Sequence, residues 1–533
     1  MSLLSRAFPL VIASGLVSVV RCQQKQQLLF VGLLDIVVHD ASESFPEGQT
    51  RHPHAELLYV ELDNVEAGGQ LTADINTKES TYYYYSDSLN YHSTGDPNIK
   101  GMIEFDGKVF FSAEDGTHVE VSGPKGVEQV PVVNLYSWDG TSVQKECGGL
   151  GAATSMTALG SKLYFKGAPA PGLTAPPVLM VFDPSTTQCN ELCSSVVEPR
   201  TPVWEYQQST MAAANGKLYF PGRDSAFGDE LWSYNPDDDS CTRVSDVRTG
   251  STTSDVDDTN LAVIGHYVYF SARADTPSAG GVGEELHKYD TRNGAISVAC
   301  DADPGGDGSP VNLFVAGDPP SLYFKARTPE HGTELWKYDP DTQSCAQLCD
   351  LRPGSIGSGI DSFTWFKSKL WMIAKPGGTS DLFRLVNYDP ASGECNANIY
   401  DGNLEDTPNA IVSSASHLYM FQKKSLGIYE VVRTDGELQF GQLTATTIFS
   451  TTNGNFQDPW ATPPVLPGLL VYSYDPSTTN GDGSTTNGDG TLSGMYLTAD
   501  NARVSFGPNG ECYIELRSDG KLHTNCDIER PNQ

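Results

Sequence analysis

The chain of 533 residues is several times longer than a typical single domain, and its hydrophobic and aromatic fractions of 38% and 10% can supply a sizeable core. This composition excludes wholesale disorder, and the 52 glycine and 33 proline residues suit short strands joined by turns. A formal net charge of −33 excludes nucleic acid and anionic membrane surfaces as partners.

The first 22 residues have the features of a secretory signal peptide. Arg6 supplies a basic start, and residues 8–20 form an apolar run that is too short to span a bilayer comfortably. The alternative is an ordinary buried helix. We predict cleavage near Cys22 and hence a secreted, extracellular protein. No later stretch is apolar enough to predict a membrane-spanning helix.

Residues 23–99 form a less regular N-terminal β segment. Three stretches, at residues 28–38, 55–62 and 81–86, are rich in apolar and aromatic residues and predict strands. We expect this segment to form a cap or a partial blade beside the repeats that follow.

A short apolar strand recurs at intervals of 48 to 55 residues between residues 100 and 445. In each copy the strand leads into a second strand that ends in a tight turn, most clearly in ELWSYNP at 230–236 and ELWKYDP at 334–340. Further apolar strands complete the unit and lead into the next one. The aromatic third residues of the recurring strand are Phe110, Tyr164, Tyr219, Tyr269, Tyr323, Trp371 and Tyr419.

Four strands in each unit of this length predict an all-β chain folded as a β-propeller. A β-sandwich would not repeat one motif seven times, and a helical solenoid would need a 3.6-residue period, which is absent. We predict about seven four-stranded blades, with eight as the alternative. We expect the N- and C-terminal segments to close the ring.

The repeats resemble the ELW-x-x-DGT family, also described as hyalin-like repeats. The resemblance is carried by ELW at 230–232 and 334–336, by the KLYF-type strands and by DLRPG at 350–354. It covers roughly residues 100–435. The chain departs from the family pattern in its turns, where Asp-Pro replaces Asp-Gly-Thr, and in carrying cysteines. The resemblance implies this fold, an extracellular setting and no catalytic activity.

Ten of the 11 cysteines remain once Cys22 leaves with the signal peptide, and an even number is typical of disulfides in an oxidising compartment. Most of them lie six or ten residues after the turn Asp or Asn of their own repeat. Where one repeat lacks the later cysteine, the following repeat lacks the earlier one. This fits bonds between the later cysteine of one repeat and the earlier cysteine of the next. The predicted pairs are Cys147–Cys189, Cys193–Cys241, Cys300–Cys345 and Cys349–Cys395, with Cys512 and Cys526 left to close a C-terminal hairpin.

A rival pairing joins Cys189 to Cys193 and Cys345 to Cys349. Residues four apart on a straight strand lie about 13 Å from each other, beyond disulfide reach, so this pairing requires a bend. Metal binding by these C-x-x-x-C pairs is a further alternative, which the secreted context disfavours.

Acidic loops are the candidates for a metal site. Asp301, Asp303 and Asp307 alternate on one turn and could supply several of the oxygens that Ca²⁺ requires, although the loop does not match a full EF-hand. The alternative is a solvated acidic turn. Other candidates are Asp255, Asp257 and Asp258 in a second loop, and His52, His54 and Glu56 near the N-terminus.

Residues 446–533 form the predicted C-terminal closing segment. A strand at 469–476 precedes a tandem STTNGDG stretch at 477–490, whose low complexity predicts a flexible loop. Residues 502–526 predict a hairpin.

No catalytic residue is predicted. The sequence lacks the G-x-S-x-G elbow, the H-E-x-x-H zinc motif and a phosphate-binding glycine-rich loop. Glu230, Glu285 and Glu334 recur with the repeat, which favours a structural role because an active site is normally unique.

These observations favour a non-enzymatic binding or structural protein of the extracellular space or cell surface, with an adhesive role and a glycan, matrix or protein partner. The alternative is a glycan-cleaving enzyme with paired carboxylates in the central funnel. An intracellular scaffold conflicts with the signal peptide and the cysteine pairing.

Overall fold

The computed structural model contains strands as its regular elements, and in the part of the chain that it describes no helix is long and apolar enough to cross a membrane. Outside residues 99–450 the structure describes the strands named below and residue 75. Inside this range it leaves out residues 124–125, 172–177, 194–197, 200–210, 257–259, 275–281, 378–381, 398, 401–410, 426–427 and 440–441.

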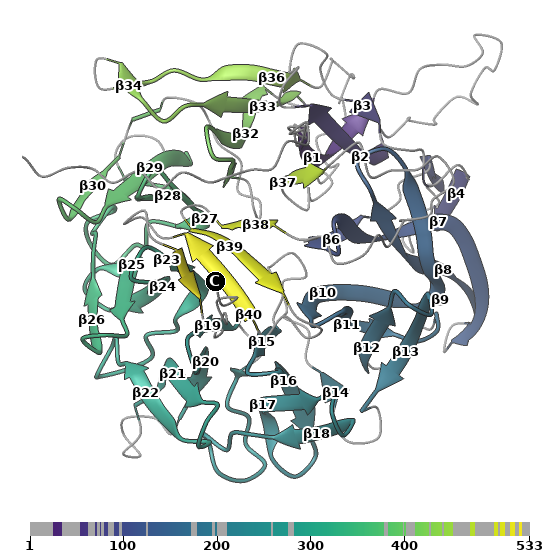
Figure 1. The fold of residues 1–533 in the computed structure, drawn as a ribbon, viewed down its shortest axis with the longest axis horizontal. Helices are drawn as coiled ribbons and strands as arrows, with labels where there is room; N and C mark the ends of the chain where they lie inside the picture. Colours follow the sequence, from purple (N-terminus) through teal and green to yellow (C-terminus); the bar gives the residue numbers. More distant parts are fainter. Residues whose placement is uncertain are drawn as a thin grey trace, which may run out of the picture.

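Seven antiparallel sheets follow one another along the chain and surround a central axis, one sheet for each repeat (Figure 1). We number these sheets blades 1 to 7. The prediction of an all-β propeller with about seven blades is confirmed.

Within each of the first four blades the strands are given in order from the central axis to the outer edge. Blade 1 contains β6 (Lys100–Phe105), β7 (Lys108–Gly123), β8 (Gly126–Trp138) and β9 (Val143–Leu150). Blade 2 contains β10 (Ala152–Leu159), β11 (Lys162–Ala168), β12 (Val178–Asp183) and β13 (Gln188–Leu192). Blade 3 contains β14 (Glu198–Pro199), β15 (Ala212–Ala214), β16 (Lys217–Asp224), β17 (Gly228–Asn235) and β18 (Ser240–Arg243), with β14 and β15 both paired to β16. Blade 4 contains β19 (Ala262–Ile264), β20 (Tyr267–Arg273), β21 (Glu284–Asp290) and β22 (Ile296–Cys300).

The remaining three blades repeat this order. Blade 5 contains β23 (Val311–Ala316), β24 (Ser321–Thr328), β25 (Gly332–Asp339) and β26 (Ser344–Gln347). Blade 6 contains β27 (Asp361–Phe366), β28 (Lys369–Ala374), β29 (Arg384–Asp389) and β30 (Glu394–Asn396). Blade 7 contains β31 (Ile411–Ser413), β32 (Leu418–Ser425), β33 (Ile428–Thr434) and β36 (Thr446–Ser450), with the small hairpin of β34 (Leu438–Gln439) and β35 (Gln442–Leu443) inserted before β36.

An additional sheet joins the two ends of the chain and closes the ring between blades 7 and 1 (Figure 1). It contains β1 (Lys25–Leu34), β2 (His54–Glu61), β3 (Gln70–Leu71) and β37 (Leu469–Tyr474). The N-terminal strand β1 pairs with the C-terminal strand β37, as predicted for closure by both ends. The buried side chain of Gln27 fastens this sheet to blade 1, because its amide nitrogen donates to the Gly140 carbonyl at 3.0 Å and its oxygen accepts from the Trp138 indole at 2.9 Å.

Two further sheets lie outside the blades. One is the hairpin of β4 (Glu79–Tyr83) and β5 (Asn90–Thr94), and the other contains β38 (Met495–Thr498), β39 (Asn501–Phe506), β40 (Cys512–Leu516) and β41 (Leu522–Thr524). The predicted signal peptide and the predicted flexible loop at 477–490 lie outside the described residues.

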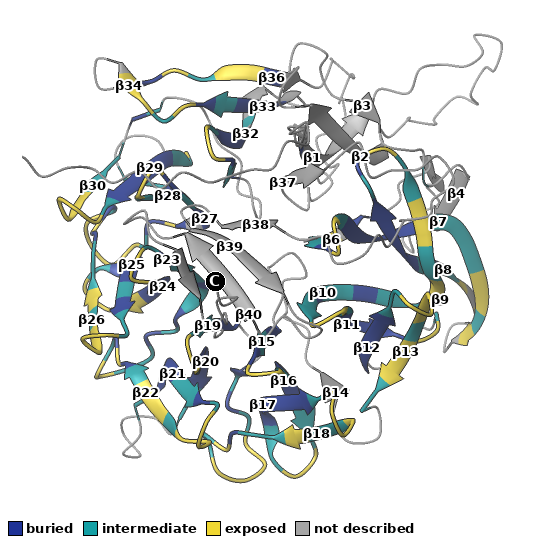
Figure 2. Ribbon diagram, in the orientation of Figure 1, coloured by how far each residue is buried: buried dark blue, intermediate teal, exposed yellow. Residues whose placement is uncertain are grey.

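The recurring aromatic strand becomes the second strand of each blade, where both of its faces are covered (Figure 2). In β20, for example, the residues between Tyr267 and Arg273 are all buried. A tight turn precedes this strand, and in blade 3 Asn215 and Gly216 both take positive φ, the backbone that a two-residue hairpin turn needs.

Aromatic pairs connect consecutive blades. The ring on the second strand of one blade contacts a ring on the third strand of the next, with centroids 5.5 to 6.3 Å apart. This repeated contact explains why both strands carry aromatic residues, since each blade packs on its neighbours. The pairs are Phe110–Phe182, Tyr164–Tyr234, Tyr219–Tyr289, Tyr269–Tyr338 and Tyr323–Tyr388.

Candidate functional site

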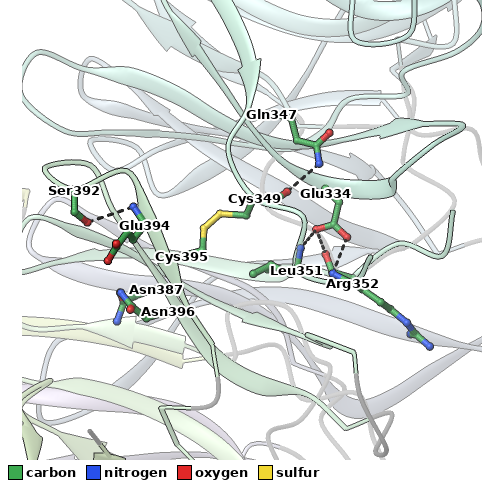
Figure 3. The surroundings of a disulfide bond; sticks show 11 residues. Glu334, Gln347, Cys349, Leu351, Arg352, Asn387, Ser392, Glu394, Cys395 and Asn396 are labelled. Carbon is green, nitrogen blue, oxygen red and sulfur yellow. Dashed lines mark hydrogen bonds between the residues drawn. A yellow bond between two sulfur atoms is a disulfide. The ribbon is translucent and has the colours of Figure 1, made fainter. Parts of the chain in front are cut away.

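Four disulfides lie at the outer edge of the ring and join neighbouring blades. Figure 3 shows one of them, in which Cys349, just after β26, reaches Cys395 of β30 in the next blade. The bonds are Cys147–Cys189, Cys193–Cys241, Cys300–Cys345 and Cys349–Cys395, the same pairs that the cysteine spacing predicts.

The rival bonds within one blade do not form, because Cys193 and Cys349 lie past the end of their strands and bond the following blade. The same bonds leave neither C-x-x-x-C pair free to bind metal. Cys512 lies on β40, and Cys526 falls outside the described residues.

A buried glutamate lies next to the disulfide in Figure 3 and holds the loop that leads to the next blade. The carboxylate of Glu334 accepts the Leu351 N–H at 3.0 Å and the Arg352 N–H at 3.3 Å. The Ser358 hydroxyl donates to the same carboxylate at 2.8 Å. Burial raises the pKa of Glu334, although these donors oppose the rise.

The glutamates of blades 3 and 4 occupy the same position five residues before the turn. Glu285 accepts the N–H groups of Ala302 at 2.7 Å and Gly308 at 2.6 Å, and burial raises its pKa to about 8. Glu230 accepts the Val247 N–H at 3.2 Å and the hydroxyls of two serines, and burial raises its pKa also. The repeated glutamates therefore organise the interblade loops.

An ion-pair network lies beside these loops around Arg273, the last residue of β20 in blade 4. The Arg273 guanidinium bonds Asp255 at 2.8 Å, Glu284 at 2.7 Å and Asp307 at 2.8 Å. Burial lowers the pKa of Arg273, but the hydrogen bonds to Asp307 and Asp255 outweigh it and raise the pKa. Each of the three nitrogens of this guanidinium thus donates to one of the protein's own carboxylates.

The predicted calcium loop takes a different structure from the expected one. Asp307 turns to Arg273, while Asp303 bonds the Gly305 N–H of its own turn at 3.3 Å. Burial and then the neighbouring Asp303 raise the pKa of Asp301, which disfavours its charged form. Asp301, Asp303 and Asp307 do not converge, and among the described residues no group of three His, Cys, Asp or Glu side chains could hold a metal ion. Ca²⁺ binding by this loop stays a prediction.

The other predicted metal candidates lie partly outside the described residues. Asp255 pairs with Arg273, and the structure leaves out Asp257 and Asp258. His54 and Glu56 belong to β2, and His52 precedes the described part of that segment.

A serine and a histidine are hydrogen-bonded in the turn between β31 and β32. Ser416 Oγ lies 2.8 Å from His417 Nδ1. Burial, and then the neighbouring Arg433, lower the pKa of His417. The two residues are adjacent in one exposed turn, and no hydrogen bond from the ring to a carboxylate is found among the described residues. This pair therefore lacks the third member of a catalytic triad.

The role of Arg273 was not predicted, although the repeat contained a signal for it. An arginine stands four residues after the recurring aromatic in blades 3, 4 and 5, as Arg223, Arg273 and Arg327. Arg223 pairs with Asp229, and Arg273 is the centre of the network described above. A basic residue at a fixed place beside loops rich in aspartate predicts ion pairs rather than metal ligands.

No family model and no curated protein matches the chain. Solved structures match about two thirds of it: a puromycin-hydrolyzing peptidase of Mycobacterium tuberculosis (12% identity, 66% of this chain, 53% of that chain, TM-score 0.39) and a puromycin hydrolase (16%, 66%, 53%, 0.39). The β-propeller domain of the Trilobed protease from Pyrococcus furiosus is also similar (9%, 67%, 99%, 0.39). The match spans about half the length of the first two proteins.

This comparison contradicts the predicted function. The expectation was a non-enzymatic binding or structural protein, with a glycan-cleaving enzyme as the alternative, whereas the matched structures are named as peptidases or parts of them. The identities are 9–16% and the TM-scores 0.39, so no residue role is transferred from these proteins to this chain.

Proposed function

We propose that this chain is the propeller part of a peptidase-type protein that works in an oxidising, extracellular compartment. The names of the matched structures supply the class of reaction to test. In this proposal the ring is a rigid entrance through which the peptide substrate reaches the catalytic groups. Those catalytic groups lie outside the described blades.

The observation that supports this role is that the buried carboxylates already accept hydrogen bonds from the protein's own loops. Groups with strongly raised pKa values are the usual candidates for acid–base chemistry. In blades 3, 4 and 5 burial raises the pKa of the repeated glutamates Glu230, Glu285 and Glu334, and each accepts hydrogen bonds from the loop behind it. Their commitment to the loops supports a frame that holds its shape rather than a set of catalytic acids.

The four disulfides support the oxidising compartment. Secretion through a signal peptide at residues 1–22 and membership of the ELW-x-x-DGT repeat family belong to the same proposal. Both are consistent with a repeat protein whose joints are covalently clamped.

The test uses the tagged full-length protein, isolated under mild conditions from the cells that make it, together with any chains that accompany it. The isolate is incubated with a pool of unstructured peptides, and cleavage products are identified by mass spectrometry. We expect cleavage above that of a mock isolation. An isolate that cleaves no peptide would overturn the proposal.

Two variants test whether the peptide cleavage depends on the folded ring. Leu335→Asp places a charge at a fully buried position of blade 5 and should abolish folding, secretion and the co-isolated cleavage together. Glu330→Gln changes an exposed residue of the same blade and should leave cleavage unchanged. Cleavage that survives Leu335→Asp would mark the activity as a contaminant.

A further inference from the structure

The disulfides divide the ring into two clamped halves. Blades 1, 2 and 3 are bonded in series by Cys147–Cys189 and Cys193–Cys241. Blades 4, 5 and 6 are bonded in series by Cys300–Cys345 and Cys349–Cys395. Each half is therefore a covalently braced unit.

The joint between blades 3 and 4 carries other residues at the two bridge positions. The later position, ten residues after the turn Asn235, is Ser245, and the earlier position, six residues after Asp290, is Ile296. Ser245 donates its hydroxyl to the buried Glu230, and Ile296 packs against the apolar cluster of this joint. The contact here is noncovalent.

The apolar cluster across this joint is small. It has nine buried members, and three of them are alanines, at positions 212, 214 and 272. The equivalent cluster between blades 5 and 6 has twelve buried members, one of which is Cys349 of the disulfide at that joint. Between blades 6 and 7, where no described disulfide lies, the cluster has thirteen buried members at residues 366–448, and it continues into six more at residues 99–138. The joint between blades 2 and 3 has a cluster of only eight buried members, but a disulfide bridges it. The 3–4 joint combines a small core with the lack of a bridge among its described residues.

An ionic contact crosses the 3–4 joint in place of the bridge. Asp255 belongs to the loop that is anchored to blade 3, since the neighbouring Ser254 bonds Glu230 and the Asp229 carbonyl. The Arg273 side chain of blade 4 bonds Asp255, and the Arg273 N–H donates to the Ser254 carbonyl at 2.7 Å. Both side chains are about a quarter exposed, at 23% and 29%, so solvent and salt can weaken this pair.

We propose that the ring opens at the joint between blades 3 and 4, with the Asp255–Arg273 pair as its latch. The two clamped halves then move apart as units, and the closed state returns when Arg273 regains Asp255. This inference concerns the ring itself and does not depend on the proposed peptidase role.

Three matched backbone hydrogen bonds make the proposal measurable. In each of them an N–H within one residue of the end of one blade's second strand donates to the loop that the preceding blade holds. The bonds are Arg273 to Ser254 at the 3–4 joint (2.7 Å), Arg327 to Gly308 at the 4–5 joint (2.7 Å) and Lys375 to Ser358 at the 5–6 joint (2.6 Å). Their geometry is equal, so unequal hydrogen exchange reports unequal opening.

Hydrogen exchange of the purified protein at neutral pH, followed at these three amides, is the test. We expect the Arg273 amide to exchange faster than the other two by about tenfold or more, and the difference to grow with salt. Equal exchange at the three joints, or faster exchange at a bridged joint, would overturn the proposal.

Two substitutions separate the latch from its surroundings. Asp255→Asn removes the ion pair that crosses the joint. It should raise the hydrogen-exchange rate of the Arg273 amide and leave the Arg327 and Lys375 amides unchanged. Asp307→Asn removes an ion pair of Arg273 that does not cross this joint. It should leave the exchange rate of the Arg273 amide closer to the wild-type rate. If both variants behave alike, Asp255 is not the latch.

Discussion

Glu285 shows most clearly how burial and hydrogen bonding oppose each other in this ring. Two backbone N–H groups favour its carboxylate form, yet its full burial raises the pKa to about 8. The folded state therefore binds a proton that the unfolded chain has already released above its ordinary value of 4.5. The stabilising contribution is complete below that ordinary value and is lost as the pH rises through 8.

This linkage predicts the pH dependence of a variant. Between pH 5 and pH 8 the free energy of unfolding of the wild type should fall relative to Glu285→Gln, by an amount on the order of 2 kcal/mol. Urea denaturation of both proteins at the two pH values measures the difference. Exposed Glu330→Gln serves as the control and should follow the wild type. A difference between Glu285→Gln and wild type that stays constant with pH would contradict the assignment.

Gly308 leaves room for the same carboxylate. A Cβ at this position would lie 2.5 Å from Glu285 Oε2 and 2.9 Å from the Ala302 Cβ. We expect Gly308→Ala to lower the free energy of unfolding by about 1–3 kcal/mol, because the loop has no space to move into. Gly305→Ala, in the same loop, meets its nearest neighbour at 3.7 Å and should be nearly neutral. Thermal melts that rank the two variants in the opposite order would refute this packing.

At the scale of strands and loops, each disulfide adds a covalent tie between two blades that already pack through their aromatic pairs. Cys349 and Cys395 are separated by 46 residues. In the chain-entropy model, replacing both by alanine should lower the free energy of unfolding by about 2–4 kcal/mol. Guanidinium denaturation of the oxidised variant and wild type measures the loss, and Ser392→Ala on the adjacent turn controls for local packing. An unchanged midpoint would show that the joint gains nothing from the bridge.

The strands and cysteines could be predicted because they follow a fixed count. The recurring aromatic marks the second strand, and the turn residue places Cys349 and Cys395 on neighbouring outer edges. The loops could not be predicted in the same way, since their partners come from other strands. Asp307 was expected beside calcium, but β20 brings Arg273 to it across 34 residues of sequence.

At the scale of the whole molecule, closure depends on residues at opposite ends of the chain. The sequence predicted that both ends take part, but the particular contact of Gln27 with Trp138 could not be read from it. No repeat motif surrounds Gln27, and its partner lies 111 residues away. The function was predicted wrongly for a similar reason. The repeat motif specifies the ring but contains no motif for a reaction.

Removal of the closing strand should open the ring. Deletion of residues 1–34 removes β1, which separates β37 from β2 and leaves the Trp138 indole without Gln27. We expect a lower melting temperature and faster proteolysis in blades 7 and 1, since the ring loses its continuous hydrogen bonding. Deletion of residues 1–22 keeps β1 and serves as the matched control. Equal stability of the two truncated proteins would contradict closure by β1.

Non-reducing peptide mapping of the purified protein tests the ring of clamped blades most directly. The fold predicts four linked peptides, each joining neighbouring repeats, that carry Cys147–Cys189, Cys193–Cys241, Cys300–Cys345 and Cys349–Cys395. Bonds between Cys189 and Cys193 and between Cys345 and Cys349, or free thiols at these positions, would contradict it.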